Sequence, residues 1–191
     1  MTKPRDFLIY AGLGAVLTIA LLILLFAGPR WLSTPTPTTD GEGAAAPIET
    51  RKIRASLFYV NADGTGLSNI EQEVPYGEGT VEQAKRIIEA QLMTPSEPLA
   101  SAIPQGTKLR ALFLTTGGEA YVDLSGELQG NHPGGTTNEI LTVYSLVNAL
   151  TSNLPAVKGV QILIDGKEVD TLAGHLDLRR PIEPDSRWVT Q

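Results

Sequence analysis

The segment NHPGGTTNEILTVYSLVNALTSNLP, residues 131–155, places a Pro-Gly-Gly loop directly before a stretch with helical spacing. Apolar residues recur at every third or fourth position along it: Ile140, Val143 or Tyr144, Val147, Leu150 and Leu154. This spacing predicts a long amphipathic helix whose apolar face packs against a sheet.

The start of this helix has two interpretations. In one, Gly134, Gly135 and the first amides of the helix cradle an anion. In the other, the glycines turn the chain and Thr136 caps the helix, with Glu139 in the capping-box position. A nucleotide-binding loop has a lysine after its glycines or a third glycine at dinucleotide spacing, and this segment has neither. Because the Glu139 carboxylate also suits the positive end of the helix dipole, we favour the capping interpretation.

The residues before this segment predict a hairpin and a second helix. Strands at 53–60 and 67–74 flank a turn rich in Asn, Asp and Gly. A helix is predicted from about residue 81 to about residue 93, with Thr80 and Gln83 in capping-box spacing. Its apolar face comprises Val81, Ala84, Ile88 and Leu92.

Two further hairpins complete the predicted fold. Strands at 109–116 and 119–125 are separated by two glycines, and a final hairpin turns at Asp165 and Gly166. The predicted order is ββαββαββ, with no alternation of single strands and helices. We therefore expect an α+β fold, with a largely antiparallel sheet of about six strands and two helices on one face.

The N-terminal residues predict a membrane anchor. Residues 7–26, FLIYAGLGAVLTIALLILLF, form a run of 20 residues without a charge, which is long enough to cross a bilayer as a helix. The run exceeds the apolar part of a cleaved signal peptide, so we favour an uncleaved signal anchor. Lys3 and Arg5 precede it and Arg30 follows it, which places residues 1–6 in the cytoplasm and the rest outside.

A tether and one domain follow the predicted anchor. Residues 27–50 include a stretch rich in Pro, Thr, Gly and Ala, and residues 51–191 have the length of one domain. The chain has no cysteine, so the domain is held by core packing without disulfides. The formal net charge of the whole chain is −6, with both signs interspersed, which argues against binding of nucleic acid.

Three segments of the domain carry a family resemblance. They are GTKLRALFLTTGGEAYVDLSGEL at 106–128, GGTTNEILTVYSLVNALT at 134–151, and VKGVQILIDGKEVDTLAGHLD at 157–177. Together they resemble the GerMN domain, named from the spore germination and sporulation protein GerM. The resemblance implies a membrane-attached, extracytoplasmic domain. The chain departs from the family in having one copy of the domain and no lipoprotein cysteine.

The two histidines give weak support for a metal site. His132 and His175 lie far apart in the sequence, and neither has a second nitrogen or sulfur ligand at metal-binding spacing. We expect no metal and no cofactor.

Catalytic arrangements are also weakly supported. Ser125 or Ser145 with His175 lacks the Gly-x-Ser-x-Gly turn of a nucleophile, and Ser145 falls within a predicted helix. Asp123 and Glu127 could form a carboxylate pair for glycan hydrolysis. Asp123 more simply caps the turn that follows it.

Most aromatic residues fall on predicted strands or on the core-facing side of a helix. They are Phe58, Tyr59, Phe113, Tyr121 and Tyr144, and most are expected to pack in the core. Trp188 lies in the C-terminal tail, where it either folds back over the sheet or is exposed to bind a partner. We favour folding back.

The sequence thus predicts a non-enzymatic binding or scaffold domain in the bacterial cell envelope, linked to sporulation or germination by its resemblance. The expected partner is an envelope protein or peptidoglycan, and the membrane is reached through residues 7–26. Exposed sheet edges are compatible with lateral self-association. The expected location is the cytoplasmic membrane, single-pass, with the domain on the periplasmic side. The alternative is a glycan hydrolase that uses a carboxylate pair.

Overall fold

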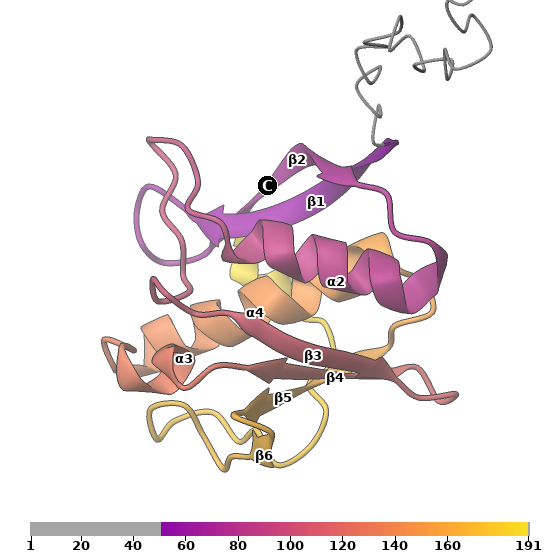
Figure 1. The fold of residues 1–191 in the computed structure, drawn as a ribbon. Helices are drawn as coiled ribbons and strands as arrows, with labels where there is room; N and C mark the ends of the chain where they lie inside the picture. Colours follow the sequence, from indigo (N-terminus) through magenta and orange to yellow (C-terminus); the bar gives the residue numbers. More distant parts are fainter. Residues whose placement is uncertain (1–50, 191) are drawn as a thin grey trace, which may run out of the picture. The chain divides into compact units, whose positions relative to one another are not determined.

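A hairpin begins the part of the chain that the computed structural model describes, residues 51–190 (Figure 1). These residues belong to one compact unit, Glu49–Gln191. The predicted cytoplasmic segment, membrane anchor and tether at residues 1–50 lie outside the described residues. Within residues 51–190, no helix combines the length and the apolar character needed to cross a membrane.

The first hairpin forms one sheet together with the C-terminal tail. β1 (Lys52–Val60) and β2 (Leu67–Pro75) pair antiparallel along their full length, as predicted. The tail adds the 3-10 helix η1 (Ser186–Trp188) and the short strand β7 (Val189–Thr190). β7 pairs parallel with Leu67 and Ser68, so the strand order is β1-β2-β7.

Four strands form a second sheet. β3 (Leu109–Leu114) and β4 (Glu119–Leu124) make the predicted second hairpin, and β5 (Gly159–Ile164) and β6 (Lys167–Glu168) make the third. The order is β3-β4-β5-β6, and β4 and β5 are parallel. The third hairpin turns at Asp165 and Gly166, with φ angles of 50° and 78°. Positive φ at both positions is the geometry for which Asp-Gly is favoured.

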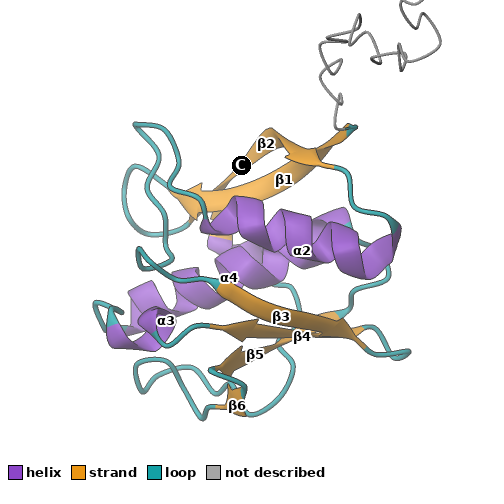
Figure 2. Ribbon diagram, viewed as in Figure 1, coloured by secondary structure: helices purple, strands orange, loops and turns teal. Residues whose placement is uncertain are grey.

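The helices form a layer between the two sheets (Figure 2). α2 (Gly79–Leu92) contacts β1 and β2 on one side and β3 on the other. α4 (Thr136–Asn153) contacts β1 and β5, and the short helix α3 (Glu127–Gly130) precedes it. Both long helices lie within a few residues of their predicted positions.

The prediction of one largely antiparallel sheet with helices on one face was wrong. A helix-containing crossover joins β4 to β5, and such a connection gives parallel strands rather than a hairpin. α4 is buried around most of its circumference, including Leu141, Val143, Leu146 and Leu150. A helix with so little exposed surface needs a sheet on each side.

The capping box predicted for α2 is also absent. The helix begins at Gly79 without a side-chain cap, and Thr80 plays no capping role. Gln83 instead accepts a hydrogen bond from the Gly77 amide at 2.9 Å and donates to the Pro75 carbonyl at 3.3 Å. It therefore fixes the connection from β2 into the helix. Val81, predicted on the core face, is 38% exposed.

The outer edge of β1 is closed by groups from other elements. The Asn153 side-chain amide accepts from the Ser56 N–H at 2.9 Å and donates to the Ser56 carbonyl at 2.8 Å. Gln91 does the same at Phe58, with distances of 2.9 Å and 2.7 Å. These amides take the place of a neighbouring strand and attach α4 and α2 to the edge of β1.

We predict that Gln91→Ala lowers the free energy of unfolding by about 2–4 kcal/mol, because two buried backbone groups of Phe58 lose their partners and a cavity forms. The measurement is denaturant unfolding followed by circular dichroism. The matched control is Glu89→Ala on the exposed face of the same helix, with an expected change within about 0.5 kcal/mol. Equal effects of the two substitutions would contradict the structural role of Gln91.

Candidate functional site

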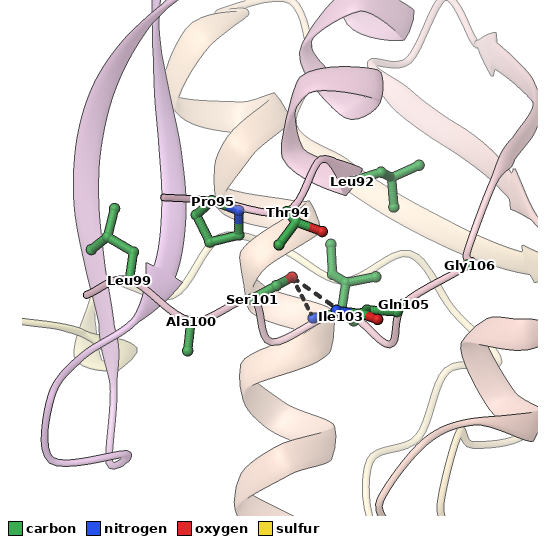
Figure 3. Close-up of a pocket in the computed structure, with 9 residues that line it drawn as sticks. All are labelled: Leu92, Thr94, Pro95, Leu99, Ala100, Ser101, Ile103, Gln105 and Gly106. Atoms are coloured by element: carbon green, nitrogen blue, oxygen red, sulfur yellow. Dashed lines mark hydrogen bonds between the residues drawn. The ribbon is translucent and has the colours of Figure 1, made fainter. Parts of the chain in front are cut away.

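A pocket lies between the end of α2 and the loop that follows it (Figure 3). Its volume is about 500 Å³, within the range of pockets that hold small molecules or short peptides. The lining residues are Leu92, Thr94, Pro95, Leu99, Ala100, Ser101, Ile103, Gln105 and Gly106. None of them carries a charged or aromatic side chain.

The pocket loop, residues 93–108, is held in place at several points. The Ala100 carbonyl accepts from the Val60 amide at 2.8 Å, which attaches the loop to the end of β1. The Thr142 hydroxyl of α4 lies 2.7 Å from the Ala102 carbonyl, to which it donates. The Thr107 hydroxyl donates to the Pro104 carbonyl at 2.7 Å. The pocket is therefore formed by a loop that is already ordered.

A smaller pocket of about 160 Å³ lies on the other side of this loop. Ser101 lines both pockets, and Pro133, Asn138 and Leu141 contribute from the start of α4. The loop therefore separates a larger hollow at the end of α2 from a smaller one at the start of α4.

Glu139 does not close a capping box. Its side chain is fully buried, α4 follows Gly135 without a side-chain cap, and Thr136 is exposed. The carboxylate accepts from the amides of Leu172 at 2.8 Å, Ala173 at 3.0 Å and His175 at 2.9 Å. The capping interpretation was thus wrong, because Glu139 holds the loop after β6.

The environment of Glu139 favours the charged carboxylate. Burial alone would raise the pKa of Glu139, but hydrogen bonds from the backbone amides of Ala173, His175, Leu172 and Leu176 outweigh it and lower this pKa. The imidazole Nδ1 of His175 lies 3.1 Å from the same carboxylate. The first turn of α4 therefore carries a carboxylate that is bound by backbone amides of the same protein. It is not an empty anion-binding site.

The two histidines serve different loops. His132 accepts from the Gly134 amide through Nδ1 at 3.0 Å, and its Nε2 lies 3.2 Å from the Thr142 hydroxyl. His175 contacts Glu139. Across residues 51–190, no three His, Cys, Asp or Glu side chains come together in a way that could hold a metal ion.

The structure does not bring the proposed catalytic residues together as a triad. Ser145 is buried and donates to the Thr142 carbonyl, while His175 is paired with Glu139. Asp123 does not cap the turn that follows it. It accepts from the Gly166 amide at 2.7 Å and from Arg110 at 3.2 Å, which fixes the final hairpin against β3.

The hydroxyl of Ser125 accepts from the Lys108 amide at 2.9 Å. Glu127 lies on α3, where the Ser125 hydroxyl contributes most to lowering its pKa, with the Glu127 amide second. Both residues therefore take part in local contacts at the end of β4.

Trp188 folds back, which is the favoured of the two predictions. Its ring stacks on Tyr144 of α4, with centroids 6.4 Å apart, and η1 leads into β7 beside β2. Phe113 departs from the prediction of core packing, because it is 61% exposed on β3.

The pocket was not predicted from the sequence. Residues 94–107 form a proline-containing connection between α2 and β3. Their length was the available signal, because loops of this length within a compact domain are uncommon and are often functional. No motif in the loop specifies which side chains line a hollow.

Comparisons with known proteins agree with the geometry of the fold. A family model described as "Germane: Sporulation and spore germination" matches residues 56–170. The chain is similar to a solved structure described as a "Putative Lipoprotein" from Clostridium perfringens, with 25% identity and a TM-score of 0.51, over 71% of this chain and 89% of that one. No curated protein matches significantly.

A second solved structure supports the fold. It contains the tandem GerMN domains of the sporulation protein GerM from Bacillus subtilis, with 16% identity and a TM-score of 0.52. The match covers 71% of this chain and 46% of that chain.

We predict that Glu139→Gln lowers the free energy of unfolding at neutral pH by about 2–4 kcal/mol, because the carboxylate that binds several buried amides is lost. The lowered pKa of Glu139 in the folded state means that its contribution is complete above the pKa of the unfolded carboxyl. This contribution disappears as the pH falls through the folded-state pKa. The wild-type protein should therefore lose more stability on acidification than the variant.

The measurement is denaturant unfolding at a series of pH values from neutral to acidic. Glu168→Gln, at an exposed position on β6, is the control, with an expected change at neutral pH within about 0.5 kcal/mol. A parallel loss of stability with pH in the wild type and Glu139→Gln would rule out this role for Glu139.

Proposed function

This chain belongs to the Germane family of sporulation and spore germination, and from that premise we propose that it is a membrane-tethered binding or scaffold domain of the bacterial cell envelope. The family is not a known enzyme family. The domain is proposed to work outside the cytoplasm by contact with another envelope component, without catalysing a reaction.

The observation that carries this proposal is that no carboxylate side chain lines the pocket. The pocket is lined by uncharged residues, while Glu139 and Asp123 are each engaged in holding a loop or a hairpin. Catalytic carboxylates need access to substrate, and Asp123, one member of the alternative hydrolase pair, is only 7% exposed, although Glu127 is exposed. An ordered, uncharged hollow supports recognition of a ligand more than acid–base chemistry.

The proposed location rests on residues 1–50. The uncharged run at 7–26 would act as a single-pass anchor in the cytoplasmic membrane, and residues 27–50 as a tether to the domain. The similar Clostridium perfringens protein carries a name that implies attachment to a membrane, which supports an envelope location. The proposed partner is an envelope protein or peptidoglycan, and lateral self-association is compatible with this role.

We predict that the full chain, expressed in its host and treated with a short-range crosslinker in intact cells, is recovered from the membrane fraction in a complex with an envelope component. Replacing residues 7–26 with a cleavable signal peptide should release the domain from the membrane and reduce the yield of that complex. The measurement is quantitative mass spectrometry of purified crosslinked material. Recovery of the unaltered chain from the cytosol would contradict the proposed anchoring.

A second experiment separates binding from hydrolysis. The full chain in detergent is incubated with purified peptidoglycan, which is then sedimented and analysed for soluble fragments. We expect no release of fragments, with or without binding. Release that disappears in Asp123→Asn would instead support a glycan hydrolase.

A further inference from the structure

Two backbone groups of residues that line the larger pocket have no hydrogen-bond partner within residues 51–190. The Ala100 carbonyl accepts from Val60, so the backbone of Ala100 faces β1. The Leu99 amide donates to the Ser96 carbonyl at 3.1 Å in the preceding turn, which leaves the Leu99 carbonyl and the Ser101 amide on either side of Ala100. Within residues 51–190, no hydrogen bond uses the Leu99 carbonyl or the Ser101 amide.

We propose that the larger pocket binds an extended, uncharged peptide segment of a partner protein, which adds to the first sheet beside residues 99–101. This inference rests on the proposed binding function and specifies the chemistry of its ligand. The guest residue opposite Ala100 donates its N–H to the Leu99 carbonyl and accepts from the Ser101 amide with its own carbonyl. Strand addition of this kind supplies affinity through the backbone and specificity through side-chain pockets.

Two positions in the middle of this edge of the first sheet are already occupied. Asn153 pairs with Ser56, and Gln91 pairs with Phe58, through both backbone groups of each residue. These amides exclude a guest strand from the middle of β1. The loop at Ala100 extends the sheet past them and presents an exposed edge, since Ala100 itself is exposed. This end of the edge borders the pocket.

The pocket lining sets the side chains that the guest carries. Leu92, Leu99 and Ile103 supply aliphatic surface, and Thr94, Ser101 and Gln105 supply neutral polar groups. A charged guest side chain would lose water without gaining an ion pair from any of the lining residues. A volume of about 500 Å³ accommodates a few residues of aliphatic or hydroxyl type.

The test uses the full chain in detergent micelles and the peptide TVAIT, blocked at its C-terminus and carrying a fluorescent label on an N-terminal linker. Fluorescence anisotropy should show saturable binding with a Kd between about 10 µM and 1 mM, as expected for a contact of a few residues. A peptide with an N-methyl group on its central residue should bind at least about tenfold more weakly, because that residue can no longer donate to Leu99. The charged peptide TVEKT should also bind at least about tenfold more weakly.

One substitution in the loop tests the backbone amide, and one outside the pocket serves as the control. Ser101→Pro removes the amide hydrogen and should weaken binding of TVAIT by at least about tenfold, whereas Glu89→Ala, at an exposed position on α2 outside the pocket lining, should bind within about threefold of the wild type. Circular dichroism of both variants checks that the fold is kept. If Ser101→Pro does not fold, the N-methylated peptide tests the same geometry on the unaltered protein.

Absence of binding by TVAIT at millimolar concentration would overturn the proposal, as would equal binding of the N-methylated or the charged peptide. Either result would leave the crosslinking experiment on the whole protein unaffected. Failure of the pocket proposal is therefore distinguishable from failure of the proposed envelope function.

Discussion

The arrangement of this domain depends on how the backbone of β1 is satisfied. One edge of β1 pairs with β2, and the other edge has no neighbouring strand. A buried N–H or carbonyl without a partner is costly, so the second edge needs hydrogen bonds from elsewhere. Asn153 and Gln91 supply them from the two long helices. These contacts fix α2 and α4 against the first sheet, and the opposite sides of the helices then carry the second sheet.

Local elements of this fold could be predicted from the sequence, but their assembly could not. The three hairpins follow from short turn signals such as Asp165-Gly166, and the helices follow from apolar spacing. The parallel pairing of β4 with β5 depends on a crossover between distant segments. Likewise, Gln91 and Asn153 look like ordinary polar helix residues until β1 is placed beside them. The pairing of the strands and the roles of these two amides therefore depend on tertiary contacts, which local sequence patterns do not reveal.

The roles of side chains in the candidate site were also difficult to predict from the sequence. Glu139 stands three residues after Thr136, which is the spacing of a capping box, yet it binds amides more than thirty residues away. A carboxylate near a helix start satisfies both arrangements, and only burial by the loop after β6 decides between them. The pocket loop gave even less information, because neutral aliphatic and hydroxyl side chains form no motif. The binding role proposed for it rests on shape and on unpaired backbone groups, which are properties of the folded chain.

The position of the pocket relative to the chain has a mechanical consequence. The described chain enters the domain at one end of β1, and Ala100 is attached to Val60 at the other end. A pulling force applied between residue 51 and a partner held at Ala100 would therefore act along the length of β1. Hydrogen bonds between antiparallel strands run perpendicular to that direction, so the bonds from Lys52 to Val60 would share the load. Such a shear geometry resists extension better than one in which the bonds open one after another.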